Sequence, residues 1–117
     1  MKMYFIVNKD IEISKGKLSG QVGHASMSYL YSRMEDEDFK LKLKDYMVEQ
    51  KKIILKGTEN QIKKLEKDSI DNNLGYITIR DLGYTELESG TLTCICVGIS
   101  GIDEIPKITK RLRLFTD

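Results

Sequence analysis

The segment 14–25, SKGKLSGQVGHA, holds the side chains of this sequence best suited to chemistry. Lys17, Gln21 and His24 follow one another at intervals of four and three residues, so on a helix they share one face. Lys17 falls where that helix is expected to begin, and the partial positive charge of a helix start disfavours a cation and favours an anion. A lysine at this place therefore suggests an anionic partner, either a phosphate or a developing oxyanion.

Two later segments carry further polar side chains. The loop 81–85 (DLGYT) follows an expected strand, and the segment 89–93 (SGTLT) leads into another. Ligands of open α/β sheets bind beyond the carboxyl ends of the strands. If the strand before Lys17 and the strand before Asp81 run parallel, both segments open at the same edge of the sheet and form one site.

These residues also have plain structural interpretations. His24 has no second histidine or nucleophile near it in sequence, and we interpret it as a structural residue of the helix. Asp81 could be a turn residue that accepts backbone hydrogen bonds before Gly83. Lys17 and Asp81 could also simply pair with each other.

The elements that must position the site follow from apolar periodicity and from capping signals. The order is β-α-α-β-α-β-β-α, which predicts one α/β domain over residues 1–117, with a mixed sheet of about four strands and helices on both faces. Thr58 and Gln61 form a capping box that begins the third helix. The expected strands are 3–7, 52–56, 76–80 and 92–99, and the expected helices are 16–33, 39–49, a third from 58 to a stop at Gly75, and a last one that begins near Pro106.

The buried faces can be predicted as well. On the first helix the core residues are expected to be Leu18, Val22, Ala25 and Tyr29. On the third helix they are expected to be Ile62, Leu65, Ser69 and Ile70, and on the last helix Ile105, Ile108 and Leu112. The two cysteines, Cys94 and Cys96, should lie on one face of a strand as buried thiols.

Composition narrows the class of protein. The chain has 117 residues and a formal net charge of +1, so overall charge does not indicate a nucleic-acid binder. Apolar runs are far shorter than the roughly 20 residues that span a bilayer, and residues 1–7 are too short for a signal peptide. With one histidine and two closely spaced cysteines, a structural zinc site is not expected. We therefore expect a cytoplasmic protein with no membrane segment.

The three polar segments together resemble a known family, the archaeal and eukaryotic (second) type of peptidyl-tRNA hydrolase. In that family a hydrophobic strand precedes Gly-Lys-Gly-Lys, two small residues, Gln, two further positions and His-Ala. Residues 14–25 keep most of this motif. Residues 81–86 and 89–93 correspond to its later Asp-Ala-Gly-Arg-Thr-Gln loop and Pro-Gly-Ser-x-Thr segment.

The resemblance implies hydrolysis of the ester that joins a peptide to the terminal ribose of tRNA, without metal or cofactor. The implied partner is the acceptor end of peptidyl-tRNA, and the family tends to form dimers, for which Tyr29, Leu30 and Tyr31 could supply a surface. The catalytic residues carried over by the motifs are Lys17, Gln21, Asp81, Thr85 and Thr93. The implied substrate-binding residues are Lys15, Gly83, Tyr84, Gly90 and Thr91.

The later loop departs from the family pattern. Tyr84 replaces an arginine and Glu86 a glutamine, which moves the loop two charges towards negative and should weaken attraction to tRNA phosphates. Tyr84 could compensate by stacking on a terminal base. Ser89 also replaces a proline, and Leu92 a polar residue.

Two other functions remain open at this point. One is a non-catalytic module of the same fold that binds tRNA or a protein. The other is a hydrolase that acts on a different acyl ester or amide.

Overall fold

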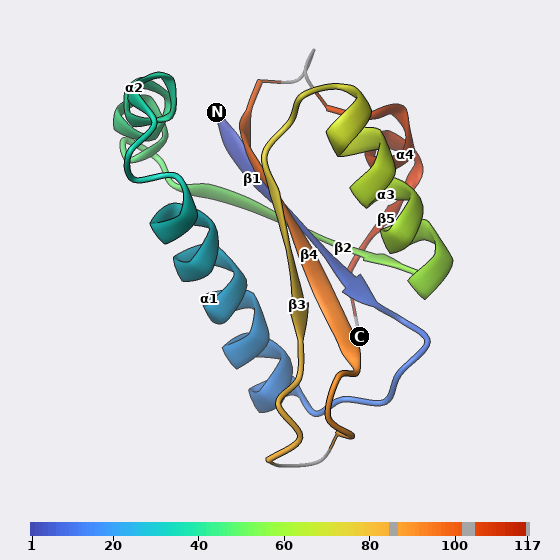
Figure 1. Ribbon diagram of the computed structural model, residues 1–117. Helices are drawn as coiled ribbons and strands as arrows, with labels where there is room; N and C mark the ends of the chain where they lie inside the picture. The colour runs from blue at the N-terminus through green and yellow to red at the C-terminus, as the bar shows by residue number, and fades with distance from the viewer. Residues whose placement is uncertain (85–86, 102–104, 117) are drawn as a thin grey trace.

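The structure is a computed structural model that describes residues 1–84, 87–101 and 105–116. Its centre is a five-stranded sheet in the order β3-β4-β1-β2-β5 (Figure 1). Along the chain the elements are β1 (Lys2–Asn8), α1 (Lys15–Ser32), α2 (Glu37–Tyr46), β2 (Lys51–Gly57), α3 (Glu59–Asp71), β3 (Tyr76–Arg80), β4 (Leu92–Ser100), α4 (Lys107–Arg111) and β5 (Arg113–Leu114).

The strand directions bring the predicted site segments to one edge. β1 pairs in parallel with β2, and β4 is antiparallel both to β1 and to β3. β3 therefore runs parallel to β1, as the sequence analysis required for a single site. The start of α1 and the segment after β3 lie at the same end of the molecule (Figure 1).

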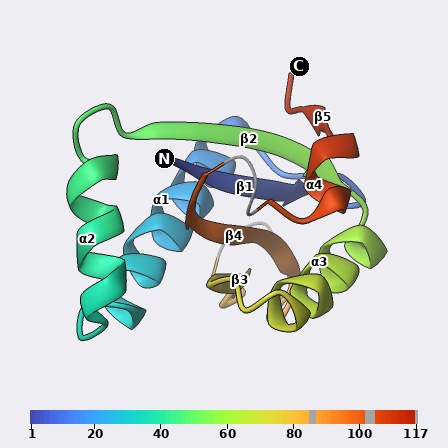
Figure 2. The same ribbon diagram turned by 90° about the horizontal axis from the view of Figure 1, so that it is seen from above.

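The sheet separates two apolar clusters. Met3, Phe5 and Val7 of β1 face the cluster under α1 and α2, while Tyr4 and Ile6 face the cluster under α3 and α4. Side chains of a strand alternate between faces, so a continuous apolar run is what a strand covered on both sides requires. Figure 2 shows α1 and α2 on one side of the sheet and α3 and α4 on the other, which confirms the predicted layers.

Local signals account for the starts of the long helices. The Ser14 side chain accepts a hydrogen bond from the Lys17 backbone N–H and so caps α1. Thr58 and Gln61 form the predicted capping box of α3. The predicted inner face of α1 is confirmed, because Leu18, Ala25 and Tyr29 are buried and Val22 packs against the same cluster.

Several predictions about α3 and α2 were wrong. Ile70 is 63% exposed, although Ile62, Leu65 and Ser69 are buried as expected. The left-handed conformation after α3 belongs to Asn73, with φ 54°, and not to Gly75. Helix α2 ends at Tyr46, before the predicted Glu49. Asparagine, after glycine, is a residue found in the left-handed conformation at helix ends, so Asn73 accounts for the earlier stop of α3.

The carboxyl-terminal part also differs from the prediction. Strand β4 continues through Ser100, one residue beyond its predicted end. Helix α4 ends at Arg111, and Arg113–Leu114 forms the fifth strand by pairing with Leu55 and Lys56 of β2. Ile105, Ile108 and Leu112 nevertheless pack against the second cluster as expected.

Candidate active site

Lys17 and Asp81 form the centre of the predicted site. Lys17 Nζ lies 2.7 Å from Asp81 Oδ1, and the exposed fractions of the two side chains are 18% and 2%. Lys17 comes from the first turn of α1, and Asp81 directly follows β3. An ion pair that is largely removed from water is screened much less than a surface pair. The charge of Lys17 is therefore fixed beside the carboxylate.

Gln21 and Thr93 connect this pair to the sheet. Gln21, one helical turn after Lys17, is only 8% exposed, and its Nε2 lies 3.5 Å from Asp81 Oδ1. The hydroxyl of fully buried Thr93 lies 3.0 Å from Gln21 Oε1 and 3.1 Å from the Ile79 carbonyl oxygen. A hydroxyl has one proton, so it donates to one of these acceptors at a time. The amide of Gln21 is thereby held toward Asp81.

An irregularity in the sheet directs Thr93 toward α1. Ile79 of β3 stands opposite Cys94, but the next residue, Arg80, stands opposite Leu92, so the register shifts at Thr93. An extra residue of this kind changes the direction of a side chain, and such bulges are frequent beside active sites. Neighbouring residues of a regular strand face opposite sides of the sheet. Because of the shift, Thr93 and Cys94 both face the α1 side, and Thr93 lies next to Gln21.

The loop after β3 is shaped around Asp81. Its Oδ2 accepts a hydrogen bond of 2.7 Å from the Gly83 N–H. Its backbone N–H donates to the Thr91 carbonyl, and its own carbonyl accepts from the Gly90 N–H, each at 2.8 Å. Gly83 and Gly90 have φ values of 84° and 86°, a conformation that glycine adopts without strain. The turn role considered for Asp81 and the pairing with Lys17 are thus both present.

The surroundings of Asp81 favour its charged form. The hydrogen bond from Lys17 is the largest cause that lowers the pKa of the Asp81 carboxyl, and the Gly83 N–H and the charge of Lys17 lower it further. Burial raises the pKa but does not outweigh these effects. Asp81 is therefore ionised at neutral pH, which suits a group that orients a water or a cation better than one that takes up a proton.

The remaining predicted site residues differ in their placement. Lys15 and Tyr84 are exposed, and Tyr84 is 85% exposed. Thr91 donates from its hydroxyl to the Glu88 carbonyl and is half-buried. Thr85, together with Glu86, lies outside the described residues. His24 is exposed on α1, so the interpretation of a structural histidine was wrong.

Asn8 is a structural support of the site that the sequence analysis missed. It is 1% exposed at the end of β1. Its Nδ2 donates to the Leu92 carbonyl, and its Oδ1 accepts from the Asp10 N–H, both at 2.9 Å. It thus ties the end of β1 to the residue before Thr93 and orders the start of the loop that leads to Lys17. A polar residue that directly ends an apolar strand was the available signal.

The arrangement has the parts that ester hydrolysis needs. A carboxylate has about four acceptor positions and an ammonium three donors. Asp81 accepts bonds from Lys17 and Gly83 and lies near Gln21, so it retains capacity for a water molecule. Lys17 uses one donor on Asp81 and can direct another at a developing oxyanion.

The chain belongs to the peptidyl-tRNA hydrolase family PTH2, whose model matches residues 1–115. This finding confirms the resemblance noted in the sequence. The chain is 34% identical over 116 residues to a peptidyl-tRNA hydrolase of Haloquadratum walsbyi, and the match covers 98% of this chain and 100% of the relative. It is 33% identical to peptidyl-tRNA hydrolases of Sulfurisphaera tokodaii, over 117 residues with 97% of each chain covered, and of Saccharolobus solfataricus, over 118 residues with 97% and 98% covered.

Within residues 1–84, 87–101 and 105–116, none of the helices combines the length and the apolar character that crossing a bilayer requires.

Proposed function

We propose that this protein hydrolyses the ester bond between peptide and tRNA in peptidyl-tRNA and releases free tRNA and peptide. One observation carries the proposal beyond family membership. The shielded Lys17–Asp81 pair lies at a sheet edge, with Gln21 and Thr93 beside it. These residues come from the motifs on which the resemblance rests.

The proposed reaction begins with a water molecule held by Asp81. The water oxygen attacks the ester carbonyl carbon and forms a tetrahedral intermediate whose oxyanion is stabilised by Lys17. The bond from that carbon to the ribose oxygen then breaks, the carbonyl re-forms, and a proton from the attacking water ends on the ribose hydroxyl. Gln21 orients the water or the ester, and Thr93 holds Gln21 in place. Thr85 stays a proposed member of this group.

The substrate contacts are proposed for the exposed residues around the pair. Lys15, two residues before Lys17 at the start of α1, is exposed and suits a tRNA phosphate. Tyr84 offers an exposed ring for stacking on a terminal base. Gly83, Gly90 and Thr91 present the backbone of the loop to the acceptor end. This set contains one cation, so tRNA binding should depend weakly on salt.

We also propose that the protein works in the cytoplasm, where peptidyl-tRNA arises, and that it forms a homodimer. The expected dimer surface needs correction, because Tyr29 is 3% exposed and Leu30 packs against the core. The apolar side chains that α1 leaves exposed are Met27 and Tyr31, at 69% and 77%. Sedimentation of wild type and of Tyr31→Glu tests this: a dimer that the variant weakens agrees, and a wild-type monomer at high concentration contradicts it.

The test of the function uses N-blocked aminoacyl-tRNA and measures the release of free tRNA. The matched substrate is the same N-blocked aminoacyl ester on a free nucleoside. Release from tRNA, with a much lower rate on the nucleoside ester, agrees with the proposal. Equal rates would indicate a general ester hydrolase. Tight tRNA binding without release would indicate the binding module.

A further inference from the structure

A cavity lies at the opposite end of the strands from Asp81. Its volume is about 270 Å³, and it is lined by the end of α1, the start of α2, the connection from α3 to β3, and the end of β4. Because β4 runs antiparallel to β1 and β3, its carboxyl end is far from their carboxyl ends, where the candidate active site lies. The volume is close to the lower end of the range for small-ligand sites, roughly 300–1,000 Å³.

The wall of this cavity is fixed by close backbone packing. The Gly98 N–H donates to the Gly75 carbonyl at 2.8 Å, which holds the end of β4 to the residue before β3. A Cβ atom on either glycine would collide with the Tyr29 hydroxyl. Tyr29 itself is 3% exposed and packs against Phe39 of α2 with ring centroids 5.5 Å apart. The part of the cavity wall formed by these described residues is therefore preformed.

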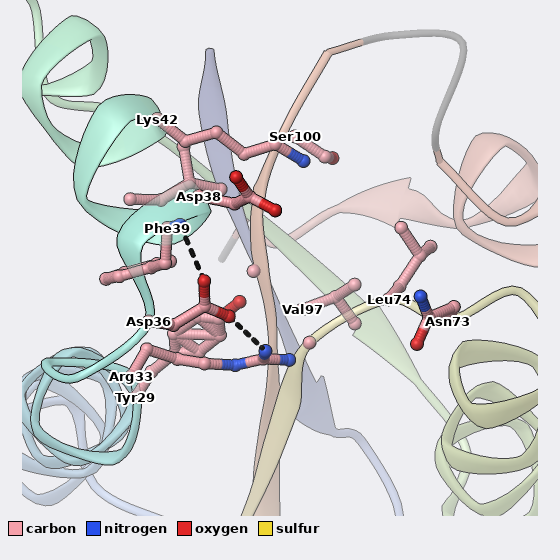
Figure 3. Close-up of a pocket in the computed structure, with 13 residues that line it drawn as sticks. Tyr29, Arg33, Asp36, Asp38, Phe39, Lys42, Asn73, Leu74, Val97 and Ser100 are labelled. Carbon is pink, nitrogen blue, oxygen red and sulfur yellow. Dashed lines mark hydrogen bonds and ion pairs between the residues drawn. The ribbon is translucent and has the colours of Figure 1, made fainter.

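The charged side chains that line the cavity have both signs. Arg33 Nη1 lies 3.5 Å from Asp36 Oδ2, and Asp36 also caps α2 through the Phe39 N–H. Asp38 and Lys42 lie one turn apart on α2 and line the same space. Figure 3 shows the Arg33–Asp36 ion pair and the side chains of Asp38 and Lys42 on the α1–α2 side of the cavity. Among the described lining residues, two cations balance two carboxylates, which disfavours a polyanion such as an RNA backbone.

One polar group in the cavity wall lacks a partner. Ser100 is 3% exposed, and among the described residues its Oγ has no hydrogen-bond partner. Buried polar side chains are nearly always hydrogen-bonded, so such a hydroxyl calls for an explanation. Ser100 lines the cavity, and Figure 3 shows Lys42 extending from α2 across the cavity toward it. An acceptor in the cavity between Lys42 and Ser100 would satisfy this hydroxyl.

We propose that this cavity binds a small zwitterion, an α-amino acid with an apolar side chain. Its carboxylate would accept hydrogen bonds from Lys42 and Ser100, and its ammonium group would face Asp38. Leu74 and Val97, on the far side of the cavity in Figure 3, supply apolar contact for the side chain. A zwitterion matches the carboxylate of Asp38 and the ammonium group of Lys42, which line the same cavity.

The test is an amide NMR titration of the whole protein with L-leucine. The matched probes are acetate and n-butylamine, which carry only one of its two charges. We expect saturable shifts at Gly75, Gly98 and Ser100, with a dissociation constant in the millimolar range or below, and at least about tenfold weaker binding of either probe. Absence of saturation by L-leucine at about 10 mM, or equally strong binding of acetate, would overturn the proposal.

Variants separate the cavity from the active site. Ser100→Ala and Lys42→Met should each weaken L-leucine binding several-fold, whereas Lys44→Met, on the exposed side of α2, should leave it unchanged. The amide spectrum reports whether each variant is folded. The rate of peptidyl-tRNA hydrolysis should be unaffected by Ser100→Ala, so failure of this proposal is distinguishable from failure of the proposed function. Unchanged L-leucine binding in both cavity variants would contradict the site.

Discussion

The Lys17 ammonium is 2.7 Å from the Asp81 carboxylate, and only 2% of the Asp81 side chain is exposed. Lys17 belongs to the first turn of α1, which follows β1, whereas Asp81 follows β3. Strand β4 lies between β1 and β3 in the sheet. The contact therefore depends on the parallel directions of β1 and β3. It joins the two motifs of the sequence into one site.

Removal of the Thr93 hydroxyl should release the Gln21 amide. Thr93→Val keeps the shape of the side chain but removes the bond to Gln21. We expect a loss of about 1–2 kcal/mol in the free energy of unfolding and a fall in kcat of roughly tenfold to a hundredfold, because a displaced catalytic group loses alignment. Denaturant titration and single-turnover hydrolysis measure the two effects.

The matched control is Thr78→Val in β3. The Thr78 hydroxyl donates to Glu66 of α3 at 3.0 Å, on the other face of the sheet. A comparable loss of stability with an unchanged kcat is expected. Equal loss of kcat in both variants would contradict a specific role of Thr93.

Gly83 and Gly90 should respond differently to alanine. Both have positive φ, so Ala costs about 1–2 kcal/mol of strain at either position. At Gly83 the new Cβ would also lie 2.8 Å from the Ser89 backbone nitrogen, whereas at Gly90 nothing lies within 4 Å. Gly83→Ala should therefore destabilise more and lower kcat, because the Gly83 N–H orients Asp81. Equal effects of the two variants on melting temperature and kcat would contradict this account of the loop.

The Asp81 pair should stabilise the fold above the ordinary pKa range of a carboxyl group. The pKa of Asp81 is lowered in the folded protein, chiefly by the hydrogen bond from Lys17. Its contribution is therefore complete above the unfolded pKa of about 4 and is lost as the pH falls through the lower folded value. The denaturant midpoint of wild type relative to Asp81→Asn should be constant from about pH 5 to 7 and converge below about pH 4. A difference that grows above pH 5 would contradict the lowered pKa.

The two cysteines should be unreactive in the folded protein. Cys94 and Cys96 are fully buried, and burial raises the pKa of the Cys94 thiol to about 11. The thiolate is the reactive form, so a disulfide reagent at pH 8 should modify neither thiol on the time scale of seconds in which it modifies the denatured chain. Rapid native reaction would contradict the burial of these thiols.

Much of this fold could be predicted because the signals were local. The alternation in 76–80, the capping box at Thr58 and the apolar face of α1 each depend on neighbouring residues. A single site required β1 and β3 to run parallel, a condition that the sequence left open; the strands are parallel, and Lys17 reaches Asp81. Strand β5 was missed because only Arg113 and Leu114 form it, and its pairing with β2 is set by the folded sheet.

The finer structure of the site could not be predicted. Thr93 contacts Gln21 through a shift of register between β3 and β4, and no local pattern marks that shift. The spacing of Lys17, Gln21 and His24 predicted one shared face, yet only Lys17 and Gln21 contact Asp81, while His24 is exposed. Helical spacing fixes the direction of a side chain but not whether another element covers it.

The most direct test of the account is a double-mutant cycle for hydrolysis of N-blocked aminoacyl-tRNA by wild type, Lys17→Ala, Asp81→Asn and the double variant. Lys51→Ala controls for the loss of one charge, because it removes an exposed lysine of β2 that pairs with Glu49. Circular dichroism verifies folding. We predict that each single change lowers kcat by about 10²-fold or more, that the double variant is little worse than either, since the two act as one unit, and that Lys51→Ala is near wild type. Folded single variants that keep the wild-type rate would contradict the assignment of this site.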